Sequence, residues 1–149
     1  MRTLQEWFEI YSQSHMNSTN KVIHKVCVPA ITFSTLSGLL AIPHPFAELV
    51  GGWLNWATLA LVLTLAFYFR LGIRTGLVMT LFLSVLFFIS AALLDTLGRG
   101  NLAVLSVAVF VVAWIGQFIG HKIEGKKPSF FQDLQFLLIG PAWILLARK

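Results

Sequence analysis

Charge is what this sequence has least of. Only 11% of its 149 residues are charged, whereas 57% are hydrophobic. A soluble domain normally has about 25% charged residues, so this chain cannot cover its surface with polar groups. Its length also leaves no room for a second domain. We therefore expect one all-α, polytopic integral membrane domain over residues 1–149.

Other features that would point to a function are absent as well. The single cysteine, Cys27, excludes an internal disulfide. We expect no signal peptide, because Glu6 and Glu9 interrupt the N-terminal segment before any apolar run. There is no Gly-rich phosphate loop, nucleophile elbow or cysteine metal motif. The net charge is +5, but the basic residues form no stripe interleaved with aromatic residues. We therefore expect anionic lipid rather than nucleic acid as a partner.

Four apolar segments are long enough to cross a bilayer. They are expected at about residues 22–42, 49–69, 76–94 and 102–120, and each is near the ~20 residues that a crossing requires. A short glycine-containing loop at residues 95–101 joins the last two. The chain is therefore predicted to have four transmembrane helices.

A further helix is expected before the spans. Within residues 3–13, large apolar side chains recur at helical spacing, which is typical of an amphipathic helix lying at the membrane interface. These side chains are Leu4, Trp7, Phe8 and Tyr11. We expect Trp7 and Tyr11 at head-group depth. Residues 17–20 then offer several side chains that could cap the next helix.

The last apolar stretch, residues 130–147, differs from the four spans. Polar side chains and a Gly-Pro pair interrupt it. A broken span, a re-entrant helix and a surface-lying helix all fit this pattern. We favour a helical segment that lies on the membrane or dips into it.

Basic residues alternate between the loops. They lie before the first span, in the second loop and after the fourth span, whereas residues 43–48 have none and the third loop has only Arg99. The positive-inside rule then places the N-terminus and the segment after the fourth span in the cytoplasm. Three histidines, His15, His24 and His121, should therefore share the cytoplasmic face.

These three histidines have polar neighbours at helical spacing. Asn20 precedes His24 by four residues and Glu124 follows His121 by three, so each pair shares a helix face. Two or three histidines with a carboxylate suit non-haem ferrous iron and O2 chemistry, although zinc and manganese also accept such ligands. A histidine at head-group depth is often only an amphipathic residue, but polar groups at membrane depth tend to be functional. His44, on the opposite side, is an internal control.

Two glycines precede His121. Gly116 and Gly120 form a small-xxx-small pattern, which predicts close helix packing just before that histidine.

Two motifs together resemble the Mpo1-like family. They are residues 15–24, His-Met-Asn-Ser-Thr-Asn-Lys-Val-Ile-His, and residues 120–128, Gly-His-Lys-Ile-Glu-Gly-Lys-Lys-Pro. Their order, their spacing and the four apolar segments between them match, so the resemblance covers nearly the whole chain. It departs from the family's founder at Met16, where the founder has a second histidine. That histidine is then not essential to the site, or this member differs.

The resemblance implies an activity. It implies an Fe(II)-dependent dioxygenase of fatty-acid α-oxidation, which uses O2 to convert a 2-hydroxy fatty acid to the acid one carbon shorter. His15, His24 and His121 would bind the iron, with Asn20 and Glu124 as their catalytic motif partners.

The substrate carboxylate needs a partner too. Lys25 and Lys122 lie beside the motif histidines in the sequence. They are topology determinants by default, and we expect that they also pair with the carboxylate.

Other functions and some further properties stay open at this point. A metal-dependent membrane lipid hydrolase would use the same ligands, and a non-enzymatic scaffold or small transporter would use none. A transporter should carry ionisable groups in mid-membrane, and the last three spans have none inside them. A homo-oligomer is compatible with the sequence. We expect the inner membrane in a bacterium or the endoplasmic reticulum in a eukaryote.

Overall fold

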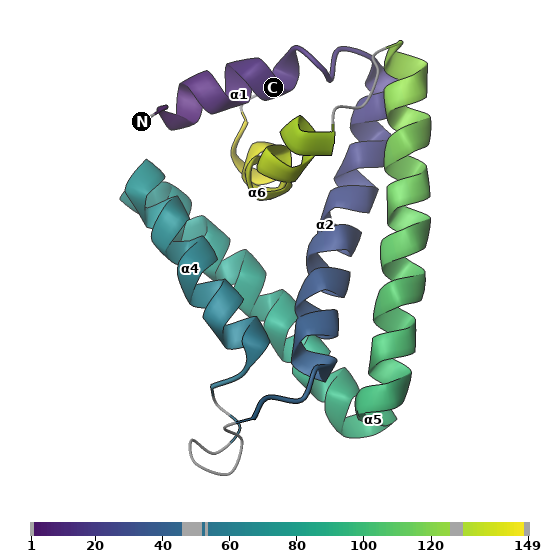
Figure 1. Cartoon of the computed structure of the whole chain (residues 1–149). Coiled ribbons are helices and arrows are strands. Elements are labelled where there is room, and N and C mark those ends of the chain that lie inside the picture. The colour runs from purple at the N-terminus through teal and green to yellow at the C-terminus, as the bar shows by residue number, and fades with distance from the viewer. Residues whose placement is uncertain (1, 46–51, 53, 126–129, 148–149) are drawn as a thin grey trace. The chain divides into compact units, whose positions relative to one another are not determined.

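Helices make up all the regular secondary structure in the part of the chain that the structure describes. The computed structural model describes residues 2–45, 52, 54–125 and 130–147, without the side chains of residues 130–135. The helices are α1 (Leu4–Ser12), α2 (Ser18–Ala41), α4 (Trp56–Leu71), α5 (Ile73–Glu124) and α6 (Phe130–Leu146) (Figure 1). The predicted all-α class is confirmed.

The chain divides into two units. The first unit contains residues 1–32 and 111–149, and the second contains residues 33–110. The long helices α2 and α5 are each divided between the two units. The prediction of a single domain stays a prediction.

In the first unit, α1 begins with a reciprocal cap. The Thr3 backbone N–H donates to Glu6 Oε2 at 2.7 Å, and the Glu6 N–H donates to Thr3 Oγ1 at 3.3 Å. These backbone and side-chain hydrogen bonds with Thr3 lower the pKa of Glu6. The predicted apolar face of α1 packs on α6, where Trp143 Nε1 donates to Ser12 Oγ at 2.9 Å. Tyr11, expected among lipid head groups, is instead 2% exposed and packs within this unit.

Asn17 determines where α2 begins. Its Oδ1 accepts hydrogen bonds from the backbone N–H groups of Thr19 and Asn20 at 2.9 and 3.3 Å, which is the arrangement of an N-cap. The helix therefore starts at Ser18, four residues before the predicted span. Pro29 lies inside it without ending it, as membrane helices tolerate.

The first part of α2 packs closely against the end of α5. A Cβ atom on Gly116 would lie 2.5 Å from Cys27 Sγ, and one on Gly120 would overlap Asn20 Oδ1. A side chain at either position would force Cys27, Asn20 or α2 itself to shift. The close packing predicted from these two glycines is confirmed.

In the second unit, α4 is shorter than the predicted second span. Asn55 and Thr58 form a reciprocal cap, with both backbone-to-side-chain hydrogen bonds at 2.9 Å, so the helix begins at Trp56. The predicted start at about residue 49 is wrong, because Asn55 is not helical; residues 46–51 and 53 lie outside the described residues. At the other end, Gly72 (φ 142°) makes a tight turn into α5.

Gly98 divides α5 into two arms. A straight helix of 52 residues would be about 78 Å long, more than twice the ~30 Å hydrocarbon core of a bilayer. Gly98 has φ 76° and ψ 165° and interrupts the helix near its middle. The loop predicted at residues 95–101 is therefore reduced to one non-helical residue. The first arm is joined to α2 by a 2.7 Å hydrogen bond between Ser37 Oγ and Ser90 Oγ.

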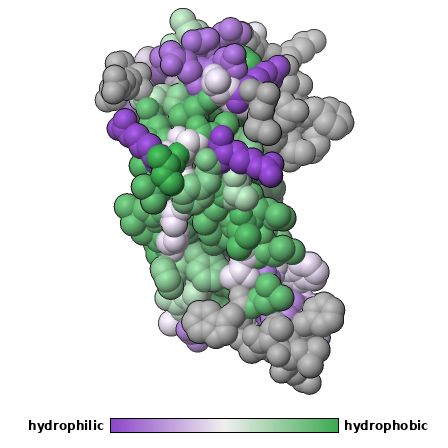
Figure 2. Space-filling view, turned by 90° about the vertical axis from the view of Figure 1, so that its left-hand side faces the viewer, coloured by the Kyte–Doolittle hydropathy of each residue, from purple (hydrophilic) through white to green (hydrophobic). Residues whose placement is uncertain are grey.

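Apolar side chains cover much of the second unit's surface. Figure 2 shows them over α4 and the first arm of α5, and they include Val62, Leu63, Leu81 and Phe88. Large exposed apolar patches mark a membrane or protein contact. Helices α2 and α5 are long and apolar enough to cross a membrane, whereas α4 has only 16 residues. The four-span topology stays a prediction.

Candidate metal centre

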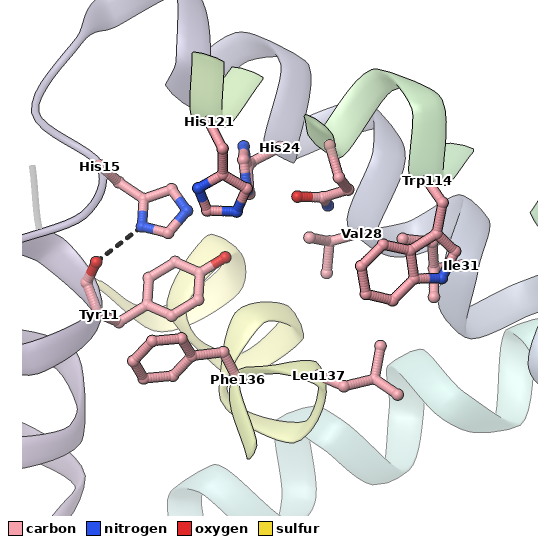
Figure 3. A pocket seen from close by; sticks show the side chains of 10 residues that line it. Tyr11, His15, His24, Val28, Ile31, Trp114, His121, Phe136 and Leu137 are labelled. Carbon is pink, nitrogen blue, oxygen red and sulfur yellow. Dashed lines mark hydrogen bonds between the residues drawn. The ribbon is translucent and has the colours of Figure 1, made fainter. Parts of the chain in front are cut away.

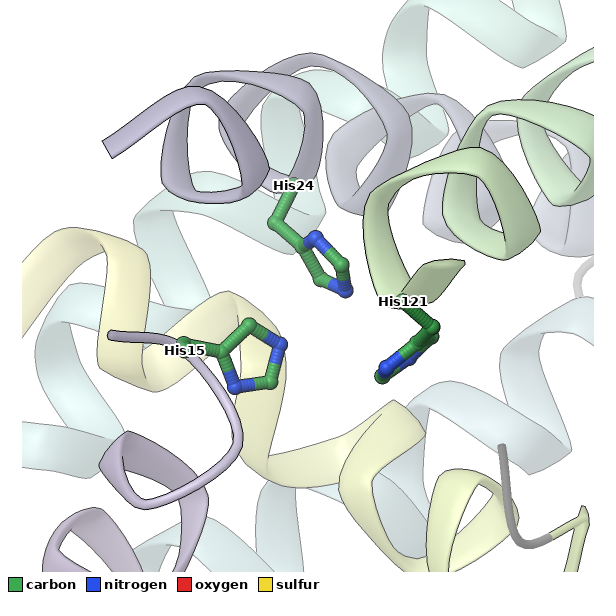
Figure 4. Close-up of side chains that lie close together, drawn as sticks. All are labelled: His15, His24 and His121. Carbon is green, nitrogen blue, oxygen red and sulfur yellow. The ribbon is translucent and has the colours of Figure 1, made fainter. Parts of the chain in front are cut away.

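Three histidines converge in the first unit, as the distribution of basic residues between the loops predicted. His15 lies on the segment between α1 and α2, His24 on α2 and His121 near the end of α5 (Figure 4). Their side chains are 1%, 2% and 7% exposed. One ring nitrogen from each lies within 4.8 Å of the other two. His44 does not belong to this group.

The backbone selects the nitrogen that two of these rings present. His15 Nδ1 lies 2.7 Å from the Tyr11 carbonyl oxygen, and His24 Nδ1 lies 3.0 Å from the Asn20 carbonyl oxygen. A carbonyl only accepts, so each Nδ1 carries the hydrogen and donates it. Each neutral ring then has its lone pair on Nε2. Backbone carbonyls commonly orient metal-binding histidines in this way.

This donor set fits a divalent transition-metal ion. Metal–nitrogen bonds to histidine are about 2.0–2.1 Å long for zinc, so two nitrogens bound to one tetrahedral ion are about 3.4 Å apart. The three ring nitrogens lie within 4.8 Å of one another. Side-chain rotations that bring them about 1 Å closer together would place all three in bonding distance of one ion.

The Glu124 carboxylate does not point into the histidine group. It accepts hydrogen bonds from the backbone N–H groups of Met16 at 2.6 Å and of Asn17 at 3.0 Å. These contacts fasten the segment that carries His15 to the end of α5. They also place a negative charge at the N-terminus of α2, where the helix dipole favours it.

Asn20 completes this attachment. It is fully buried, and its Nδ2 donates to Glu124 Oε2 at 2.9 Å and to the Ser14 carbonyl at 3.3 Å. Its Oδ1 faces Gly120 on α5. Asn20 and Glu124 thus lie beside the histidines without lining the cavity between them.

That cavity has a polar and an apolar end (Figure 3). The polar end is formed by the three histidines and Gln117, and the rest of the lining consists of Tyr11, Val28, Ile31, Trp114, Phe136 and Leu137. Its volume of about 30 Å³ is roughly twice what one water molecule needs. An ion with a small ligand fits there, but a long acyl chain does not.

Several residues of this site were not predicted as such. The Tyr11 ring stacks on His15 with centroids 4.0 Å apart and an interplanar angle of 5°. Gln117 is 6% exposed and lines the cavity together with His24. Helical spacing carries a signal for both, because Tyr11 precedes His15 by four residues and Gln117 precedes His121 by four.

The predicted substrate-binding lysines lie elsewhere. Lys25 and Lys122 are both exposed and do not line the cavity. Lys126 and Lys127, which belong to the second motif, lie outside the described residues.

Comparison with known proteins gives two matches. The family model described as 2-hydroxy-palmitic acid dioxygenase Mpo1-like matches residues 1–148. The 2-hydroxy-palmitic acid dioxygenase MPO1 of Saccharomyces cerevisiae is 29% identical over 145 residues, which cover 95% of this chain and 77% of the yeast protein. No solved structure matches the chain.

Proposed function

Because this chain belongs to the Mpo1-like family of 2-hydroxy-palmitic acid dioxygenases, we propose that it is an Fe(II)-dependent membrane dioxygenase. It would use O2 to convert a 2-hydroxy fatty acid to the fatty acid one carbon shorter, with the original carboxyl carbon released as CO2 and one water formed. The observation that supports this proposal most directly is the buried group of three histidines, together with the family membership.

The three imidazoles would hold the metal. His15, His24 and His121 would be its ligands, and a bound ferrous iron would supply the redox chemistry with O2 that such sites carry out. The Tyr11 and Asn20 carbonyls hold the rings of His15 and His24 in the required tautomer. The buried walls exclude bulk water from the reaction.

Asn20 and Glu124 would act as positioning residues. Their hydrogen bonds fix the segment that carries His15 against the end of α5. Lys25 and Lys122, which are exposed, would attract the anionic substrate to the protein surface before it enters the cavity.

The acyl chain would extend out of the cavity into the bilayer. The cavity itself is too small for it, and its apolar end is lined by Val28, Ile31 and Leu137. We propose four crossings, formed by α2, α4 and the two arms of α5, with α1 and α6 at the cytoplasmic face. The histidines would then meet the substrate at the level of the lipid head groups.

Metal content is the first test. Detergent-purified wild-type protein and the His121→Ala variant are reconstituted anaerobically with ferrous iron, with His44→Ala as the matched control. About one iron per chain in the wild type and His44→Ala, lost in His121→Ala, supports the proposal and leads to an O2-consumption assay with 2-hydroxypalmitic acid. Zinc retained in place of iron favours a hydrolase instead. Absence of metal in all three proteins overturns the proposed site.

A further inference from the structure

Among the residues that the structure describes, no lysine or arginine lines the cavity that holds the histidines. A substrate carboxylate beside the proposed iron keeps oxygen lone pairs that the metal does not use, and in a largely apolar cavity these need hydrogen-bond donors, because a buried polar atom without a partner is costly. The exposed Lys25 and Lys122 cannot supply these bonds inside the cavity.

Two side chains can donate such bonds beside the histidines. Tyr11 and Gln117 both line the cavity, and Figure 3 shows the Tyr11 hydroxyl pointing into the space between the lining side chains. Gln117 projects from α5 one helical turn before His121, so its amide lies on the same side of the helix. Both groups are therefore beside the place where a head group bound to the histidine site would lie.

The tyrosine is held rigidly in this position. Its ring is stacked on His15 and meets Phe136 edge-on with centroids 5.1 Å apart. A Cβ atom on Gly140 would lie 3.2 Å from its hydroxyl oxygen, so α6 leaves little room for the ring to turn away. The hydroxyl is thus fixed with respect to the histidine ring next to it.

We propose that the Tyr11 hydroxyl and the Gln117 side-chain amide donate the hydrogen bonds that hold the substrate carboxylate. This inference rests on the proposed function. The carboxylate lies between these two donors, and the acyl chain leaves past the apolar end of the cavity. Tyr11 and Gln117 are then substrate-binding residues, and the surface lysines are not part of the binding contact.

The test is equilibrium binding of 2-hydroxypalmitic acid to the iron-loaded protein without O2. Tyr11→Phe removes only the hydroxyl and keeps the stacked ring and the backbone carbonyl that orients His15. Gln117→Met keeps the length of the side chain. The matched control is Tyr68→Phe, because Tyr68 is the other tyrosine of the chain, is equally buried and does not line the cavity.

We expect Tyr11→Phe and Gln117→Met each to bind 2-hydroxypalmitic acid about 10- to 100-fold more weakly, as for hydrogen bonds to a charged group. Iron content should stay at the wild-type level, Tyr68→Phe should bind as the wild type does, and binding of hexadecanol, which lacks the carboxylate, should not change. This pattern distinguishes recognition of the carboxylate from a general loss of structure.

Three results would overturn the inference alone. They are unchanged affinity in both variants, an equal loss of acid and alcohol binding, and a loss confined to Lys25→Gln or Lys122→Gln. If the iron-loaded wild type binds no 2-hydroxy acid at all, the proposed function fails together with the inference.

Discussion

Removing the Glu124 carboxylate should weaken metal binding although this side chain does not reach the metal site. In Glu124→Ala, the backbone N–H groups of Met16 and Asn17 can turn to water, because both residues are exposed. The Asn20 amide is fully buried and loses its 2.9 Å acceptor. Such a loss costs about 1–3 kcal/mol. Since Glu124 is itself partly exposed, we take about 2 kcal/mol as the free energy that the variant loses for holding the His15 segment in place.

This loss of free energy determines the expected change in metal affinity. A free energy of about 2 kcal/mol corresponds to up to about 30-fold weaker binding, if metal binding requires the attached segment. Glu124→Gln keeps one carbonyl acceptor and should lose about half of that free energy, which is about 5-fold in affinity. Anaerobic titration with Co(II), whose visible absorption reports its ligands, measures both. Glu9→Gln, which changes an exposed carboxylate on α1, is the control.

The cobalt spectrum separates attachment from ligation. An attachment role lowers the affinity but leaves the spectrum of the fully loaded protein unchanged. Wild-type affinity in Glu124→Ala would refute this reasoning. A changed spectrum in loaded Glu124→Gln would show that the carboxylate is itself a ligand.

Three further results are expected. Gly120→Ala should lower the thermal stability and the iron content, because its Cβ would overlap a buried side chain, whereas Gly100→Ala, whose Cβ would meet nothing within 4 Å, should do neither. A double-mutant cycle with Trp143→Phe and Ser12→Ala should give a coupling of about 1 kcal/mol for their hydrogen bond, and additive effects would contradict it. The first turn of α1 should fray in acid: the lowered pKa of Glu6 means that its stabilisation is present above pH 4.5 and is lost as the pH falls through the folded-state pKa. Amide hydrogen exchange of α1, corrected for the intrinsic rate, measures this, and protection that does not change with pH would be the contrary result.

Much of the candidate metal centre could be predicted because the sequence features that indicate it are local or additive. Charge bias between loops needs no three-dimensional information, and it placed His15, His24 and His121 on one side of the membrane. The packing of Gly116 and Gly120 follows from residue size and helical spacing. The structure adds how close the rings are and which nitrogen each of two rings presents.

What could not be predicted is not encoded in hydropathy or helical periodicity. An amphipathic pattern shows that Tyr11 lies on an apolar face, but not whether lipid or α6 covers that face. The beginning of α4 depends on the cap made by Asn55, which hydropathy alone does not detect. The helix α5 is interrupted only by the backbone conformation of Gly98. The loop-forming residues around it do not indicate that the break is limited to one residue.

The hydrogen bonds that orient His15 and His24 go to neutral partners, so they add little negative charge to a metal bound there. Two of the rings donate to carbonyls, and the Glu124 carboxylate is directed at backbone N–H groups. Among the described residues, the convergent donor group contains imidazoles alone. A divalent ion held by three neutral ligands keeps its full double charge in a buried place, which is unfavourable until an anion joins it. A 2-hydroxy acid brings that anion, so the protein would leave part of the neutralisation of its metal to the substrate, and a neutral lipid of the same length would bind more weakly than the acid.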